Sequence, residues 1–246
     1  MNIKKHIPNI LTLGNLFCGT LAVIYAVNEN FVATALLVVL GIGFDFFDGF
    51  VARILKVQGE LGKQLDSLAD MVTSGVVPGI VMLQLLNNAF AEDKVGYFGI
   101  DNTTTDYNII AYLGLLLTLF AGYRLAKFNI DERQSDSFIG LPTPAMSLFI
   151  ISLPLITIFS EYTFFVGLIQ NKIFLVIITV LLSFIMISEL PLFSLKFKDF
   201  SFKKNGVKYL FLLVSLLLLI ILKFIAVPII ILIYILLSII SNIIKK

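Results

Sequence analysis

Residues 41–79 read GIGFDFFDGFVARILKVQGELGKQLDSLADMVTSGVVPG, and this stretch puts four aspartates into two apolar segments. Asp45 and Asp48 lie in the first segment, and Asp66 and Asp70 lie in the second. If these segments cross a bilayer, each carboxylate in its interior costs about 2.5–3.5 kcal/mol unless it is compensated. Four such costs in one region need a common explanation, which a shared polar site would provide.

Helical spacing predicts that the four carboxylates lie at a similar depth. With a rise of about 1.5 Å per residue, Asp45 lies about 12 Å from Arg53 at the end of the first helix, and Asp70 lies about 10 Å beyond Lys63 at the start of the second. Positions three, four, seven or eight apart share one face of a helix. The residues on these two faces are Asp45, Asp48, Gly49 and Ala52 on the first helix and Gly62, Asp66 and Asp70 on the second. We therefore expect consecutive antiparallel helices to aim all four carboxylates at one cavity.

A cluster of four carboxylates is predicted to bind metal. Neighbouring acidic side chains repel one another, and hard divalent cations such as Mg²⁺ relieve this repulsion by taking carboxylate oxygens as ligands. No Cys or His lies in this stretch, which argues against zinc. A structural alternative exists for each aspartate alone: Asp66 could cap a helix near Lys63, and Asp45 or Asp48 could pair with Arg53 or with another span. The occurrence of all four at these spacings favours the metal site.

The rest of the chain has the composition of an integral membrane protein. Of its 246 residues, 59% are hydrophobic and 14% are charged, where an ordinary soluble domain has about 25% charged residues. Blocks of about twenty apolar residues predict transmembrane helices, and their continuous apolar runs differ from the alternating pattern of a β-barrel. We expect an all-α, polytopic membrane helix bundle of about eight helices, centred near Cys18, Leu40, Val76, Leu116, Ile151, Ile178, Leu216 and Ile233.

The basic residues predict the orientation of these helices. If both termini are cytoplasmic, fifteen of the 18 Lys and Arg residues fall on the inner side, in agreement with the positive-inside rule. The inner residues are Lys4, Lys5, Arg53, Lys56, Lys63, Arg124, Lys127, Arg133, Lys196, Lys198, Lys203, Lys204, Lys208, Lys245 and Lys246, and the outer ones are Lys94, Lys172 and Lys223. We therefore expect a multi-pass protein of the cell membrane whose carboxylates face the cytoplasm.

The acidic residues also form a motif. Eight positions match D-x2-D-G-x2-A-R-x8-G-x3-D-x3-D without a gap, namely Asp45, Asp48, Gly49, Ala52, Arg53, Gly62, Asp66 and Asp70. This stretch resembles the signature of the CDP-alcohol phosphatidyltransferase family, and Ile7–Thr12 is similar to the family's PNxLT segment. The resemblance implies an enzyme that transfers a phosphatidyl group from CDP-diacylglycerol to a small alcohol.

The resemblance also implies roles for these residues. Asp45, Asp48 and Asp66 would hold two divalent cations, Mg²⁺ or Mn²⁺, and Asp70 would complete the metal site and act as the catalytic base. A purely structural role as a metal ligand stays open for Asp70. The residues that would contact CDP-diacylglycerol are Asn9, Thr12, Asp48, Gly49, Ala52, Arg53, Gly59 and Gly62.

Further segments indicate L-serine as the acceptor alcohol. Asn15–Gly19, and Tyr123–Asn129 followed by Phe138–Pro144, resemble the serine-accepting branch of the family in bacteria and archaea. Arg124 and Lys127 are candidates for binding the serine carboxylate, and positive-inside anchoring explains them equally well. Glycerol 3-phosphate or an inositol phosphate is the alternative acceptor, although a phosphorylated acceptor would favour a denser basic cluster. The alternative of another class is a cation or proton transporter, which predicts acidic groups near mid-bilayer that are accessible from both sides.

The resemblance divides the chain into two parts. Residues 1–190 are expected to form the phosphatidyltransferase core of six helices, with the active site between the second and third. Residues 191–246 would add a basic cytoplasmic segment and two apolar helices for lipid-facing packing or dimer contacts. A homodimer, which is common in the family, is expected, and a nucleic-acid partner is not.

Overall fold

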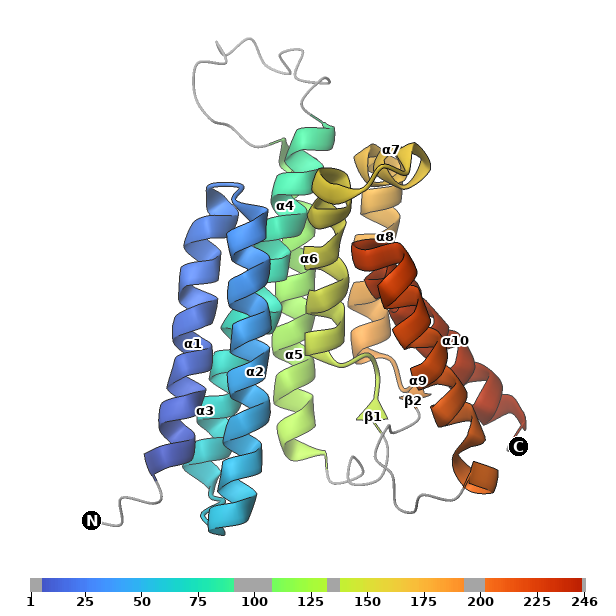
Figure 1. Cartoon of the computed structure of the whole chain (residues 1–246). Coiled ribbons are helices and arrows are strands. Elements are labelled where there is room, and N and C mark those ends of the chain that lie inside the picture. The colour runs from blue at the N-terminus through green and yellow to red at the C-terminus, as the bar shows by residue number, and fades with distance from the viewer. Residues whose placement is uncertain (1–5, 91–107, 132–137, 193–201, 245–246) are drawn as a thin grey trace.

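The computed structural model describes residues 6–90, 108–131, 138–192 and 202–244, and these residues are almost entirely helical. Figure 1 shows the helices standing side by side as a bundle. In chain order the elements are α1 (His6–Val27), α2 (Phe31–Leu55), α3 (Glu60–Asp70), the π-helical segment η2 (Met71–Val76), α4 (Val77–Ala89), the 3₁₀ segment η4 (Ile109–Leu115), α5 (Leu116–Ile130), β1 (Phe138–Ile139), α6 (Thr143–Phe159), α7 (Thr163–Gln170), α8 (Lys172–Ile187), β2 (Pro191–Leu192), α9 (Phe202–Leu222), η6 (Lys223–Ile225) and α10 (Ala226–Ile244).

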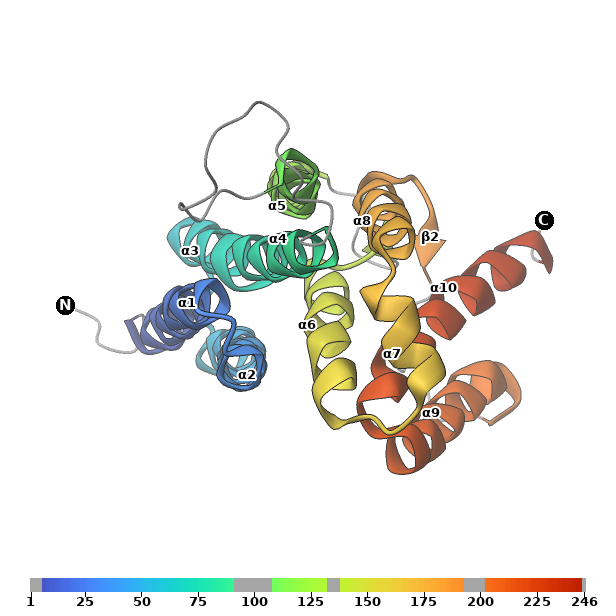
Figure 2. The same cartoon turned by 90° about the horizontal axis from the view of Figure 1, so that it is seen from above.

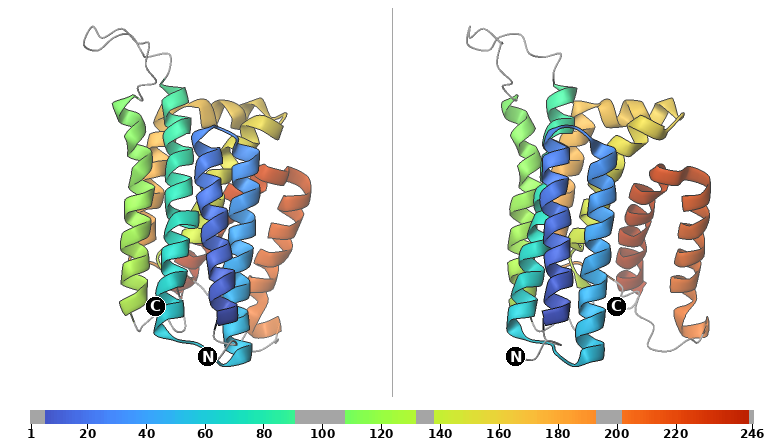
Figure 3. Two further views of the ribbon diagram at one scale, coloured as in Figure 1. Left: turned by 90° about the vertical axis from the view of Figure 1, so that its left-hand side faces the viewer. Right: turned by 60° about the vertical axis from the view of Figure 1, so that its left-hand side comes forward.

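The prediction of an all-α, polytopic membrane bundle is confirmed, but the count of eight spans is not. In the described residues, five helical segments are long and apolar enough to cross a membrane, or six if α7 and α8, bent by 75° at their junction, count as one. Each of the eight predicted centres lies in a helix. The count falls short because α6 has only 17 residues and because Lys208–Ile243 is a single apolar segment by length and composition. Within that segment, α9 and α10 pack against each other as a hairpin (Figure 3).

Basic residues separate between the two ends of the bundle as the sequence predicts. Arg53 lies in the last turn of α2, Lys63 in the first turn of α3 and Lys127 in the last turn of α5, and these helix ends lie together in Figure 1. Lys172 and Lys223 lie at the opposite end. The cytoplasmic orientation itself stays a prediction. Of the residues assigned to either side, Lys4, Lys5, Lys94, Arg133, Lys196, Lys198, Lys245 and Lys246 lie outside the described ranges.

Helix α6 forms the centre of the bundle. Viewed from above in Figure 2, it lies between α4 and the helices of the C-terminal half, and it contacts α2, α4, α7 and α10. Its residues Met146, Phe149, Ile150 and Leu153 are nearly or fully buried. With 17 residues, α6 lies at the lower end of the range of about 17–25 residues that cross a bilayer.

The start of α6 is fixed against the end of α8 by the segment around Gly140. Gly140 has φ +72°, and a Cβ at this position would collide with the carbonyl oxygen of Met186, so only glycine fits here. Its N–H donates to the carbonyl of Leu190 at 2.9 Å, and the N–H of Leu141 donates to Ile185 at 3.2 Å. Strands β1 and β2 pair antiparallel just beside this contact.

The π-helical segment η2 directly follows Asp70. The N–H of Val77 donates to the carbonyl of Val72, five residues earlier, in the pattern of a π-turn. Pro78 comes next and has no N–H for the carbonyl of Ser74, so the regular α-helical bonding is interrupted at this point. The turn places Thr73 and Ser74 in the fully buried interior. Single π-turns inside α-helices often occur at functional sites.

Candidate active site

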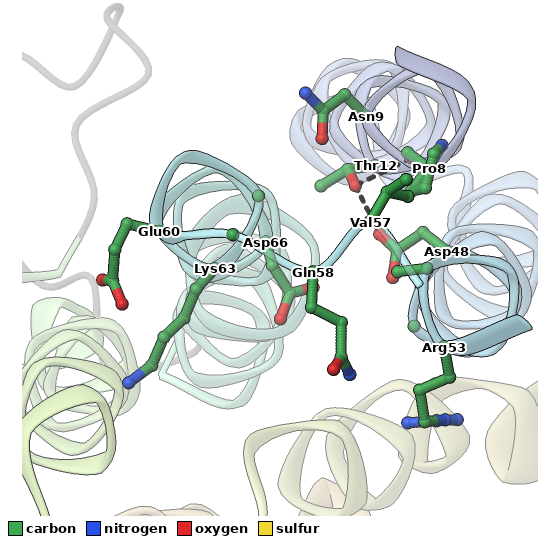
Figure 4. A pocket seen from close by; sticks show the side chains of 14 residues that line it. Pro8, Asn9, Thr12, Asp48, Arg53, Val57, Gln58, Glu60, Lys63 and Asp66 are labelled. Carbon is green, nitrogen blue, oxygen red and sulfur yellow. Dashed lines mark hydrogen bonds between the residues drawn. The ribbon is translucent and has the colours of Figure 1, made fainter. Parts of the chain in front are cut away.

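A cavity of about 460 Å³ opens at the end of the bundle where α1 begins and α2 connects to α3. Figure 4 looks into it, with Asp48 on α2 and Asp66 on α3 facing the space between these helices. All eight residues predicted to contact the donor line this cavity, namely Asn9, Thr12, Asp48, Gly49, Ala52, Arg53, Gly59 and Gly62. The structure thus gathers these residues from three helices around one space, and their contact with a nucleotide stays a prediction.

Three of the four predicted metal ligands converge at the inner wall of the cavity. Asp45, Asp48 and Asp66 each offer a carboxylate oxygen, and these oxygens lie within 4.8 Å of one another. Asp45 and Asp48 are one turn apart on α2, while Asp66 comes from α3, which runs antiparallel to α2. The helical spacing on the two faces therefore brings these three carboxylates together, as expected.

Asp70 does not belong to this group of three. It lies one turn farther into the bundle than Asp66, at the last residue of α3. One of its carboxylate oxygens, Oδ1, accepts a hydrogen bond of 3.2 Å from Nδ2 of Asn15 on α1. Its roles as fourth ligand and as catalytic base stay predictions.

Two of the structural alternatives for the single aspartates do not hold. Helix α3 begins at Glu60 with Gly59 as its N-cap, so Asp66 lies inside the helix and does not cap it. Among the described residues, no ion pair joins Arg53 to Asp45 or to Asp48. The aspartates are therefore left without the local cationic partners that would explain their burial.

The donor set fits a divalent metal ion. Oδ1 of Asp66 is buried and has no hydrogen-bond partner in the described part of the chain, which leaves a carboxylate oxygen available as a ligand. The converging atoms are all carboxylate oxygens, which suit hard cations such as Mg²⁺ and Mn²⁺. Asp48 is further fixed by the hydroxyl of Thr12, which donates to its Oδ2 at 2.5 Å (Figure 4).

Three glycines of the cavity leave space that the protein itself does not fill. A Cβ on Gly59 would meet no atom within 4 Å, and on Gly49 it would meet only a guanidinium nitrogen of Arg53 at 3.7 Å. On Gly62 the nearest atom would be Oδ1 of Asn9 at 3.5 Å. Because packing within the protein does not require glycine at these positions, the open space is suited to a bound ligand.

The two candidates for the serine carboxylate, Arg124 and Lys127, have different environments. Arg124 is only 7% exposed, and its Nη1 lies 3.5 Å from Oγ1 of Thr143, while its Nε has no hydrogen-bond partner among the described residues. Lys127 instead forms an ion pair with Glu189, with an N–O distance of 2.5 Å. Arg124 is therefore the better placed of the two to receive an acidic ligand.

Comparison with known proteins identifies the family. Residues 5–185 match the model of the CDP-alcohol phosphatidyltransferase family. The chain belongs to this family. It is 33% identical to the CDP-diacylglycerol–serine O-phosphatidyltransferase of Bacillus subtilis over 76% of this chain and 89% of that protein. It is 34% identical to the protein of the same name from Helicobacter pylori, over 74% of this chain and 70% of the relative. The archaetidylserine synthase of Methanothermobacter thermautotrophicus is 29% identical over 65% of both chains.

Family membership agrees with the metal site. CDP-alcohol phosphatidyltransferases depend on metal, and the cluster of Asp45, Asp48 and Asp66 is able to bind a metal ion. The chain is also a multi-pass membrane protein, as the apolar helices require. The number of metal ions and the choice between Mg²⁺ and Mn²⁺ stay predictions.

Several residues of the site were not predicted from the sequence. Asn15 donates a hydrogen bond to Asp70, and Thr73 donates one to Asn15. Lys63 lines the cavity, and its Nζ donates to the backbone carbonyl of Asn129 on α5 at 2.7 Å. A signal for Asn15 and Thr73 was present, because each is a polar residue in an otherwise apolar segment. Their partners could not be deduced, since they come from different helices.

Proposed function

We propose that this protein transfers the phosphatidyl group of CDP-diacylglycerol to L-serine, producing phosphatidylserine and CMP. The observation that carries the proposal is that three carboxylates converge beside a cavity. All eight residues predicted to contact CDP-diacylglycerol line this cavity. The relatives from Bacillus subtilis and Helicobacter pylori, both named for this reaction, support serine as the acceptor.

The acidic cluster would hold two divalent cations through Asp45, Asp48 and Asp66. When bound, such ions neutralise the charge of the pyrophosphate and of the departing CMP. Gly49, Gly59 and Gly62 leave the cavity wide enough for the nucleotide, and the guanidinium of Arg53 adds a positive charge at its edge. These contacts would align the phosphorus atom that carries diacylglycerol, and alignment is a large part of the catalysis of phosphoryl transfer.

Asp70 would act on the acceptor. The serine hydroxyl oxygen attacks the phosphorus, a new P–O bond forms, the P–O bond to CMP breaks, and the hydroxyl proton passes to a carboxylate oxygen of Asp70. Arg124, whose Nε has no hydrogen-bond partner in the described part of the chain, would bind the serine carboxylate. Lys127 is a weaker candidate because it is already paired with Glu189.

The location of the cavity supports an active site on the cytoplasmic side of the cell membrane. The basic residues of α2, α3 and α5 gather at the same end of the bundle as the cavity. There the acyl chains of the donor would stay in the bilayer while cytidine and serine meet in water. We assign this chemistry to residues 1–190 and a packing role to residues 191–246; the expected homodimer stays a prediction.

An assay of acceptor use tests the proposal. Purified protein receives CDP-diacylglycerol, Mg²⁺ or Mn²⁺, and labelled serine, glycerol 3-phosphate or inositol phosphate in separate reactions. We expect CMP release and labelled phosphatidylserine with serine alone, and no turnover after removal of divalent ions. Labelled lipid from a phosphorylated acceptor in place of serine would contradict the choice of acceptor, and CMP release without any divalent ion would contradict the metal site.

A further inference from the structure

A chain of hydrogen bonds links the π-helical segment to Asp70 by way of α1. Asn15 and Thr73 are both fully buried. Oγ1 of Thr73 donates to Oδ1 of Asn15 at 2.7 Å, and Nδ2 of Asn15 donates to Oδ1 of Asp70 at 3.2 Å. The carboxylate of Asp70 is therefore held from a direction that differs from that of the cavity.

The first bond of this chain determines the orientation of the Asn15 amide. An amide side chain has a carbonyl end that accepts and an NH₂ end that donates. Because the hydroxyl of Thr73 donates to the carbonyl end, the NH₂ end faces Asp70. Without that hydroxyl the amide could rotate by half a turn and bring its carbonyl oxygen toward the carboxylate, where two acceptors repel.

The surrounding backbone is shaped to allow this contact. A Cβ on Gly41 of α2 would lie 2.8 Å from both Oδ1 of Asn15 and Cγ2 of Thr73, and a Cβ on Gly19 of α1 would collide with the Thr73 hydroxyl. The π-turn that follows Asp70 directs Thr73 toward α1. Helices α1, α2 and η2 thus approach one another closely at the point where the bonds form.

We infer that Asn15 is a positioning residue for Asp70, and that Thr73 holds the Asn15 amide in the required orientation. This inference rests on the proposed function, in which Asp70 accepts the proton of the serine hydroxyl. Neither Asn15 nor Thr73 lines the cavity. Their loss should therefore reduce turnover and leave the binding of CDP-diacylglycerol unchanged.

Substitutions at Thr73 separate positioning from packing. Thr73→Val removes the hydroxyl and keeps the shape, and we expect kcat for serine-dependent CMP release to fall about tenfold, a part of the 10²–10⁴ that proton transfer contributes. Thr73→Ser keeps the hydroxyl and should restore kcat to near the wild-type value. Asn15→Leu removes the donor itself and should lower kcat about a hundredfold.

Thr118→Val is the matched control, because Thr118 on α5 also donates a hydroxyl to η2, at 3.0 Å to the backbone carbonyl of Gly75. It should keep wild-type kcat. Affinity for CDP-diacylglycerol, titrated in detergent without serine, should be the same within about twofold in all variants that fold.

The outcomes distinguish this inference from the proposed function. If the wild-type protein releases no CMP with serine, the proposed function fails. If the wild type is active and Thr73→Val keeps its kcat, or if Thr73→Ser loses as much as Thr73→Val, the positioning role fails. A loss of donor affinity parallel to the loss of kcat would also overturn it. If Thr73→Val does not fold, Asn15→Leu takes its place. Its kcat and its affinity for CDP-diacylglycerol are then measured in the same way, and an unchanged kcat or a parallel loss of affinity overturns the inference.

Discussion

The α3–η2–α4 segment and the α9–α10 hairpin are both apolar helical regions, yet they differ in what surrounds them. In the most apolar stretch of Glu60–Ala89, 61% of the residues are buried inside the protein, against 17% in that of Lys208–Ile243. In the hairpin, Leu210, Leu213 and Ile220 are all more than half exposed. These side chains face outward, where a bilayer would provide the apolar environment.

This difference teaches where to look for chemistry in a membrane protein. By length and composition both regions qualify as membrane spans, although the hairpin is the more apolar of the two. The buried segment differs because its polar side chains point into the bundle, where Asp66 meets the carboxylates of α2 and where Asp70 and Thr73 form hydrogen bonds with Asn15 on α1. Polar groups that are sheltered from lipid mark the active region, and the variants below test this contrast.

The largest effect is expected from neutralising the acidic cluster. Asp45→Asn or Asp66→Asn replaces a carboxylate by an amide of the same shape, and CMP release should fall by about 10³-fold or more because a metal ligand is lost. The measurement is CMP release over a titration of Mn²⁺. Glu29→Gln is the control, since Glu29 lies in the turn between α1 and α2 at the opposite end of the bundle. Unchanged activity and metal dependence in Asp66→Asn would remove the basis of the metal site.

The acidic cluster was largely predictable from the sequence because its spacing is helical. The spacing puts Asp45 and Asp48 on one face of the first helix and Asp66 on one face of the second. Two antiparallel helices joined by the short connection after Leu55 then bring these faces together. The cavity followed for the same reason. Asp70 shows the limit of this argument. It lies on the same face of α3 as Asp66, as the spacing predicts, but its carboxylate accepts a hydrogen bond from Asn15 and stays outside the group of three.

The number of spans and the separate environments of Arg124 and Lys127 could not be read from the sequence. Apolar runs do not reveal that α6 is enclosed or that α7 bends away from α8 by 75°, because both depend on packing between distant segments. Likewise, nothing in the order of residues pairs Lys127 with Glu189, which lies beyond three further helices. Contacts between helices, unlike periodicity within one, are not encoded locally.

Core packing should produce the next largest effect. Leu86 of α4 is fully buried, while Leu216 of α9 is 58% exposed. Leu86→Ala should lower the free energy of unfolding by about 2–5 kcal/mol because it leaves a cavity between helices. Leu216→Ala should change it by less than about 0.5 kcal/mol, since lipid or detergent can fill the gap. Reversible unfolding in mixed micelles measures both, and equal losses would show that the hairpin is enclosed as tightly as α4.

Arg124→Gln should have a smaller but selective effect. Loss of a charged hydrogen bond to the serine carboxylate costs about 1.5–3 kcal/mol, which corresponds to a rise of about tenfold to a hundredfold in the KM for serine. The KM for CDP-diacylglycerol should stay near its wild-type value. Lys127→Gln is the matched control, and it should leave both constants nearly unchanged because Lys127 is paired with Glu189. An equal rise for both substrates in Arg124→Gln would argue against a role in binding serine.

The smallest effect concerns the connection between the two regions. Nδ2 of Asn242 on α10 donates to the carbonyl of Pro191 in β2 at 2.5 Å, and β2 pairs with β1 just before α6. Because this bond is exposed, Asn242→Leu should lower the free energy of unfolding by only about 0.5–1.5 kcal/mol. Serine-dependent CMP release should stay at the wild-type rate, because the bond lies on the side of α6 away from the carboxylates and no part of the hairpin lines the cavity. A large loss of activity without a matching loss of stability would mean that the hairpin takes part in the reaction, and the contrast between the two regions would have to be abandoned.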